Sequence, residues 1–128
     1  MLTINFDSPV SLTAQITDGV RRAIAVGELA AGTVLPPVRQ LAADLGVNLN
    51  TVARAYRALE ERGLVVTRRG RGTSVAATTE TARPKREVVK DVSAKLRPLL
   101  SDARLAGLGA DQVRELVERE MKLVWKRG

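Results

Sequence analysis

The sequence GVNLNTVARAY, residues 46–56, predicts the element around which the rest of the chain is organised. Gly46 suits the left-handed end of a preceding helix, and Asn48 is a good N-cap that can accept from the backbone N–H of Thr51. A helix that begins here separates polar from apolar side chains. The polar face carries Asn50, Arg54 and Arg57, and the apolar face carries Val52, Ala55, Tyr56 and Leu59. Such a helix suits a groove of nucleic acid.

A short helix is expected directly before this one. Its apolar positions follow the spacing i, i+3, i+4 and i+7 and are Val38, Leu41, Ala42 and Leu45. Pro36 and Pro37 end the preceding loop and pre-set the start of this helix. Two short helices joined by a three- or four-residue turn with Gly are the helix-turn-helix signature. A generic helical hairpin has the same spacing, so the spacing leaves both interpretations open.

A β-hairpin is predicted after the second of these helices, which should end at Gly63. Residues 64–67 and 73–75 are short β-branched runs, and the basic loop 68–72 lies between them. A hairpin directly after a helix-turn-helix is a wing. Three arginines within four residues at its tip suit contact with phosphates, whereas a solvated charged turn is the alternative.

The chain is expected to have a DNA-binding domain at residues 1–76, a linker at 77–83 and a helical region at 84–128. Alternation of apolar and polar residues over 2–6 indicates a small edge strand or an extended arm. Ser8 and Pro9 predict the start of an amphipathic helix that ends at Gly27.

Two helices are predicted in the C-terminal region, one from Pro84 and one from about Ala110. Pro98 should kink or split the first of them. Their apolar stripe could form an intramolecular core, but two helices alone bury little, and Trp125 needs a surface to cover it. A dimer interface is therefore expected. The positions assigned to it are Val92, Leu96, Leu99, Leu100, Val113, Leu116, Val117, Met121, Val124 and Trp125.

Composition narrows the class of function. The 128 residues carry a formal net charge of +7, which favours a polyanionic partner, although many small basic proteins are merely soluble. There is no cysteine or histidine, which excludes thiolate chemistry, zinc sites of the Cys/His type and Ser-His-Asp triads. We therefore expect no catalytic residue, metal or cofactor. No apolar run is long enough to span a membrane, and no signal peptide is recognised, so a cytoplasmic location is expected.

Residues 27–75 resemble the winged helix-turn-helix domain of GntR-type bacterial transcriptional regulators. The resemblance rests on the loop glycines, Leu35-Pro36-x-x-Arg39-x-Leu41-Ala42, Thr51-Val52, Tyr56, Leu59, Gly63-Leu64 and Gly70-x-Gly72-Thr73-x-Val75. Asn50-Thr51-Val52 with Ala55-Tyr56, and a C-terminal part of about fifty residues, is similar to the short YtrA subfamily.

The resemblance implies a mainly α protein that acts as a dimeric repressor of its own operon and binds a two-fold operator in double-stranded DNA. For the YtrA type, that operon encodes a membrane transporter. The C-terminal part is too short for the ligand-binding or aminotransferase-like domains of larger relatives, and no small-molecule effector is indicated. The sequence departs from the family at Leu49, where many members carry Arg that contacts DNA and the YtrA type often has Pro.

Ten residues are expected to contact DNA: Arg39, Asn48, Asn50, Thr51, Arg54, Arg57, Arg68, Arg69, Gly70 and Arg71. Asn50 can pair with adenine, and Thr51 can reach a phosphate or a thymine methyl, although a second cap contact is its alternative role. Arg54 can bind guanine or a phosphate. Arg39 suits a phosphate, with an ion pair to Asp44 as the alternative.

The remaining arginines suit the DNA backbone: Arg57 further along the helix, and the wing arginines on phosphates or in the minor groove. Glu61 marks the end of the DNA face, and Tyr56 is expected in the core. Two other functions stay open. A non-specific architectural DNA-binding protein would use the same arginines, and a small enzyme or a protein–protein adaptor would not need them.

Overall fold

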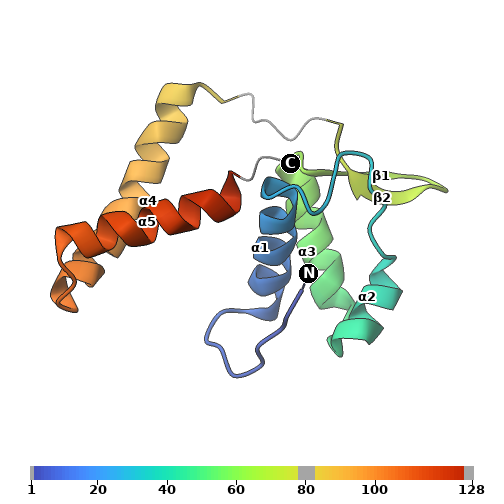
Figure 1. Ribbon diagram of the computed structural model, residues 1–128. Helices are drawn as coiled ribbons and strands as arrows, with labels where there is room; N and C mark the ends of the chain where they lie inside the picture. Colours follow the sequence, from blue (N-terminus) through green and yellow to red (C-terminus); the bar gives the residue numbers. More distant parts are fainter. Residues whose placement is uncertain (1, 78–82, 126–128) are drawn as a thin grey trace. The chain divides into compact units, whose positions relative to one another are not determined.

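The computed structural model describes residues 2–77 and 83–125, which fall into two compact units (Figure 1). The first unit holds three helices and a β-hairpin, and the second holds two helices. This confirms the predicted fold class, a winged helix-turn-helix followed by a two-helix appendage. Residues 78–82 of the predicted linker lie outside the described residues, so its boundaries stay a prediction.

The first unit is built around helix α3, which packs between the other elements. Its elements are α1 (Leu12–Ala25), α2 (Val38–Leu45), α3 (Leu49–Glu61), β1 (Val65–Arg68) and β2 (Gly72–Val75). Helix α1 runs beside α3, and the hairpin of β1 and β2 projects away from the helices (Figure 1). The core is aliphatic apart from Tyr56. Its largest fully buried side chains are Ile16, Val20, Val52, Leu59 and Val65.

The start of α1 differs from the prediction. The helix begins at Leu12, where the Ser11 Oγ accepts from the backbone N–H of Ala14 at 3.1 Å, and the predicted start at Ser8 and Pro9 is wrong. Ser8 caps a turn instead, since its Oγ accepts from the N–H of Val10. The Gln15 side chain accepts from the Asn5 N–H at 2.9 Å and donates to the carbonyls of Asn5 and Val10. These bonds hold the preceding residues as an arm, so the helix cannot start earlier.

Of the two expected forms of residues 2–6, the extended arm is present and the edge strand is absent. Leu2 and Ile4 pack against the core, while Phe6 is exposed. Gly19 of α1 makes room for the arm, because a Cβ on it would clash with Leu2 Cδ2. The alternating pattern of residues 2–6 therefore arises because one side of the arm is buried against the core, and not because the arm pairs in a sheet.

The loop before α2 pairs with the wing, which the sequence did not indicate. The Leu35 N–H donates to the Thr73 carbonyl at 2.8 Å, and the Val75 N–H donates to the Thr33 carbonyl at 2.8 Å. Val34 forms an isolated antiparallel bridge with Ser74. Strand β2 is thus hydrogen-bonded on both sides, to β1 on one side and to this loop on the other.

The second unit is a hairpin of α4 (Lys85–Leu105) and α5 (Ala110–Val124), with Gly107 at φ 93° in the turn between them. Helix α4 runs through Pro98 without interruption, so the predicted split does not occur. A proline removes a single N–H donor from a helix, a loss that an exposed helix can make up with water. Among the described residues, no helix has the length and apolar character needed to cross a membrane.

Candidate nucleic-acid interface

A three-residue turn sets the angle at which α3 leaves α2. Gly46 has φ 70° and ψ 35°, a left-handed conformation that suits Gly and ends α2 after Leu45. The N–H of Val47 donates to the carbonyl of Ala42 at 3.0 Å, which satisfies one of the free carbonyls at the end of α2. Helix α3 then starts at Leu49, as the sequence predicts.

Asn48 caps α3, but through a different donor from the predicted one. Its Oδ1 accepts from the backbone N–H of Asn50 at 2.7 Å, and not from that of Thr51. The N–H of Thr51 donates instead to the Asn48 backbone carbonyl at 3.0 Å, so it is not available to the side chain. The cap uses only the oxygen of the Asn48 carboxamide. Asn48 is exposed, and the NH₂ group of its side chain lies next to the polar face of α3.

Helix α3 divides into a buried and an exposed face, as predicted. Val52, Ala55, Tyr56 and Leu59 are buried, whereas Asn50, Arg54 and Arg57 are exposed. Thr51 is half-buried, and Glu61 is exposed at the last residue of the helix. The exposed amide and guanidinium groups therefore begin at the N-terminal end of α3, the part of a recognition helix that enters the major groove in helix-turn-helix proteins.

Tyr56 fixes α3 to the start of α2. Its ring is 6 % exposed, and its hydroxyl donates to the Pro36 carbonyl at 2.6 Å. Burial raises the pKa of Tyr56 to about 12, so the phenol keeps its proton at neutral pH and remains a donor. The prediction that Tyr56 belongs to the core is confirmed, and the hydrogen bond adds a role in holding the two helices together.

The wing presents its arginines at the tip of a short antiparallel ladder. Val65 pairs with Val75 at the buried base, and Arg68 pairs with Gly72 at the exposed end. Gly70 has φ 78° and nothing within 4 Å of a Cβ built on it, so the turn needs the backbone freedom of Gly and lies open. The three arginines, Arg68, Arg69 and Arg71, are all exposed around it.

The arginines of this surface have no carboxylate partner among the described residues. Six are concerned: Arg39, Arg54, Arg57, Arg68, Arg69 and Arg71. Over residues 2–77 the single ion pair joins Arg21 to Asp18 at 3.9 Å, away from these six. In particular, the alternative pair of Arg39 with Asp44 does not form. The surface made by the N-terminal end of α2, the exposed face of α3 and the wing thus carries uncompensated positive charge, which a polyanion can neutralise.

The second unit offers a different kind of surface. None of its described side chains is buried, and most of its apolar residues lie on one face. This face lines a hollow of about 410 Å³, made by Leu96, Leu99, Leu100, Ala103, Val113, Leu116, Val117, Glu120, Met121, Val124 and Trp125. The lining includes every predicted dimerisation residue except Val92, which is 55 % exposed on α4.

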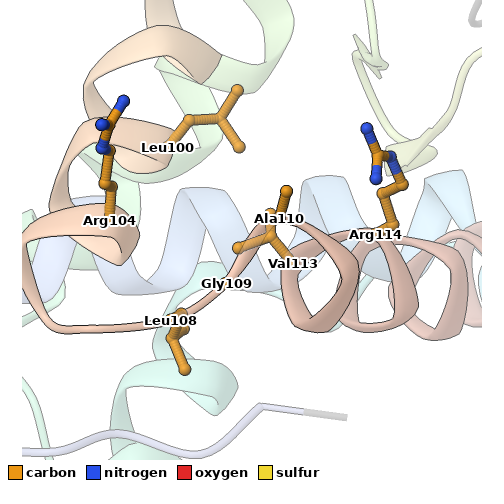
Figure 2. Close-up of a pocket in the computed structure, with 7 residues that line it drawn as sticks. All are labelled: Leu100, Arg104, Leu108, Gly109, Ala110, Val113 and Arg114. Carbon is orange, nitrogen blue, oxygen red and sulfur yellow. The ribbon is translucent and has the colours of Figure 1, made fainter.

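A second hollow lies at the turn of the hairpin, with a volume of about 510 Å³ (Figure 2). Figure 2 shows Arg104 and Arg114 on either side of it, with Leu100 and Val113 between them. The Arg114 Nη1 lies 2.8 Å from Asp111 Oδ1. No lining residue is buried, so this hollow is part of the open surface and not an enclosed ligand site.

The fold and the exposed surface define the class of protein, a winged helix-turn-helix protein that binds DNA. Residues 12–75 match the family described as bacterial regulatory proteins, gntR family. The chain is 32 % identical over 120 residues to the HTH-type transcriptional repressor YtrA of Bacillus subtilis (strain 168), a match that covers 92 % of this chain and 90 % of that protein. The protein therefore belongs to the GntR family of bacterial transcriptional regulators and is homologous to YtrA.

Solved structures agree with this assignment. A crystal structure described as a transcriptional antiterminator from Listeria monocytogenes EGD-e is 27 % identical, with a TM-score of 0.83 over 100 % of this chain and 96 % of that one. The structure of AraR(DBD) in complex with operator ORX1 is 28 % identical, with a TM-score of 0.52 over 59 % of this chain and 96 % of that one. The first unit thus has the fold of a domain that has been seen bound to operator DNA.

Proposed function

We propose that the protein is a dimeric repressor that binds a two-fold operator in front of its own operon and blocks transcription by occupying promoter DNA. The observation that carries the proposal is the set of exposed arginines on α3, the start of α2 and the wing, which have no carboxylate partner within residues 2–77 and 83–125. The similarity to YtrA, a repressor by name, supports repression. A transporter operon is the proposed target, as the resemblance of the sequence to the YtrA type implies. The protein acts in the cytoplasm, where the chromosome is.

In this proposal, the N-terminal turn of α3 enters the major groove. Asn50 donates to and accepts from adenine, Arg54 binds guanine or a neighbouring phosphate, and Thr51 contacts the backbone or a thymine methyl. Asn48 has an NH₂ group left for a phosphate. The contacts of this turn with base edges account for sequence preference, because base edges differ between base pairs in the major groove, whereas a phosphate contact such as that of Asn48 fixes the position of the helix.

The other arginines supply affinity that does not depend on sequence. Arg39 lies in the first turn of α2, where free backbone N–H groups also favour a phosphate. Arg57 reaches the backbone one turn beyond the base contacts. Arg68, Arg69 and Arg71 bind phosphates or the minor groove, and Gly70 lets the backbone of the wing approach closely.

Dimerisation occurs through the apolar face of α4 and α5. Leu99 is 65 % exposed and Trp125 is 72 % exposed, so the two helices leave part of this apolar face uncovered. Large contiguous apolar patches on soluble proteins mark interfaces. A second copy is the occupant that fits, because a pair of winged domains can bind two half-sites about 34 Å apart and so share the entropic cost of association.

Competition binding tests the DNA-binding part of the proposal. The protein is bound to its own upstream region in about 0.15–0.2 M salt, where phosphate-only binding is weak, and competed with scrambled duplex. We expect a preference for the native sequence that falls about tenfold to a hundredfold in Arg54→Ala. Arg21→Ala removes the same charge from α1 and serves as the control. Equal affinity for both duplexes would favour an architectural DNA-binding protein and overturn the repressor proposal.

Sedimentation tests the dimer. Leu96→Glu and Val117→Glu place a charge in the apolar face and should shift the protein towards the monomer. Leu105→Glu is the matched control, because Leu105 is on the same helix as Leu96 but is 87 % exposed and lies outside the lining of this face. A monomeric wild type, or dimers that all three variants leave intact, would show that this face does not form the interface.

A further inference from the structure

Leu49 is an apolar side chain in an exposed position of the candidate interface. It is the first residue of α3, it is 37 % exposed, and it does not belong to the core cluster or to the apolar residues packed against that cluster. The other large apolar residues of α3, Val52, Tyr56 and Leu59, are at most 6 % exposed. Leu49 therefore leaves more than a third of its surface accessible at the N-terminal end of α3.

The helical geometry places Leu49 between the buried side chains of α3 and the polar side chains of its exposed face. At about 100° per residue, Ala53 lies roughly 40° from Leu49 around the helix axis, and Asn50 and Arg54 follow at roughly 100° and 140°. On the other side of Leu49 the buried Tyr56 and Val52 lie at roughly 20° and 60°, so Leu49 stands at the border between the buried face and the exposed face of α3. The exposed face of α3 thus has two parts, an apolar edge made by Leu49 and Ala53, and a polar strip that begins with Asn50.

An apolar group at this end of a recognition helix has one apolar counterpart in the major groove, the 5-methyl group of thymine. A phosphate offers nothing to an aliphatic side chain, and a hydrogen-bonding base edge next to it would lose its water without gaining a partner. We propose that Leu49 contacts a thymine methyl in each operator half-site and makes that base pair part of the recognised sequence. This inference rests on the proposed function.

The contact fits the neighbouring polar groups. Asn50 is the next residue, and its side chain can pair with adenine through N6 and N7. A thymine carries its methyl on the major-groove edge, and an adenine–thymine pair presents both features side by side. Leu49 and Asn50 together therefore favour an A·T-containing step at the place where the N-terminal end of α3 meets the groove.

Removal of single methyl groups from the operator tests the inference. Once footprinting has located the site, each thymine of one half-site is replaced in turn by deoxyuridine, which lacks only the methyl. At one position we expect the wild type to lose about fourfold in affinity, the value for one buried methyl group. Leu49→Ala should lose at least as much on the thymine operator and should no longer distinguish thymine from deoxyuridine at that position.

Two variants make the result specific to Leu49. Thr51→Ser deletes the methyl group of Thr51, which is also in the first turn of α3, and should keep the deoxyuridine effect. Val10→Ala shortens an aliphatic side chain that is 48 % exposed outside α3, and it should leave both affinity and the deoxyuridine effect unchanged. Circular dichroism of Leu49→Ala checks that α3 is intact, so that a loss of affinity reports the contact.

The inference and the proposed function can fail separately. A wild type that prefers its operator but shows no deoxyuridine effect, or an operator half-site without thymine, overturns the role of Leu49 alone. An effect that persists in Leu49→Ala and disappears in Thr51→Ser assigns the methyl contact to Thr51 and also overturns it. A wild type without any preference for the operator overturns the proposed function, and the inference with it.

Discussion

Replacing Tyr56 by Phe should destabilise the first unit at neutral pH and stabilise it at high pH relative to the wild type. The substitution removes only the hydroxyl that donates to the Pro36 carbonyl at 2.6 Å and leaves the buried ring in place, so no cavity forms. A hydrogen bond of this kind contributes about 0.5–1.5 kcal/mol net. Because Pro36 is only half-buried, water can reach its carbonyl, and we expect a loss of about 1 kcal/mol near pH 8.

The sign reverses at high pH because burial raises the pKa of Tyr56 to about 12. The phenol of the unfolded chain ionises near pH 10. Between about pH 10 and pH 12 the folded wild type therefore holds a proton that the unfolded chain has lost. The free energy of unfolding then falls by up to about 1.4 kcal/mol per pH unit, a loss that the Phe variant does not share. The two stability curves should cross near pH 11, where this loss is about as large as the contribution of the hydrogen bond.

Urea unfolding followed by the methyl NMR signals of Ile16 and Val52 measures this, because both side chains lie in the core of the first unit. The Phe variant also controls for any effect of the lysines and arginines on stability at high pH, because these residues are the same in both proteins. Tyr56 is the only tyrosine of the chain, so the ultraviolet absorbance of tyrosinate gives its pKa directly. A stability difference that does not change up to pH 12, or a folded tyrosine that ionises near 10, would refute this account of the α2–α3 contact.

Further predictions concern the cap, the core and the wing. Asn48→Ala removes the bond to the Asn50 N–H and should lower the free energy of unfolding by about 1 kcal/mol, whereas Asn48→Asp should keep most of it; urea titration measures both. Leu59→Ala should cost about 2–5 kcal/mol in the same assay, because Leu59 is fully buried, while Leu105→Ala on exposed α4 should change it by less than about 0.5 kcal/mol. Replacing Arg68, Arg69 and Arg71 together by Ala should lower the slope of log affinity against log salt by about 0.9 for each phosphate that the wing no longer neutralises, and should leave the preference for the native duplex unchanged. A slope that stays the same would place the wing away from DNA.

The sequence predicts the helix-turn-helix well because the signals that define it are local. Gly46 adopts the left-handed conformation that ends α2, and Asn48 caps α3 within three residues. The division of α3 into two faces follows from its 3.6-residue period, so the exposure of Asn50 and Arg54 could be predicted without the structure. Whether these side chains contact DNA stays a prediction.

The features that the sequence did not predict depend on contacts between distant residues. The start of α1 is decided by the Gln15 side chain, which holds the backbone of Asn5, ten residues earlier, in place of a helical turn at Ser8. The pairing of Leu35 with Thr73 joins residues 38 positions apart, and the loop around Leu35 has no distinctive strand signal. Pro98 signals a kink or a split, and of these two the split does not occur, because α4 continues through it. A local pattern gives the tendency of a segment, and tertiary contacts decide its boundaries.

The most direct test of the account is a hydroxyl-radical footprint of the full-length protein on its own upstream region. A dimer that uses α3 and the wing of each subunit should protect two segments related by two-fold symmetry, with centres about 34 Å apart or a multiple of that distance. Arg54→Ala should weaken both segments equally. Uniform protection along the duplex, or a single protected segment without symmetry, would contradict the claim that this protein is a dimeric operator-binding repressor.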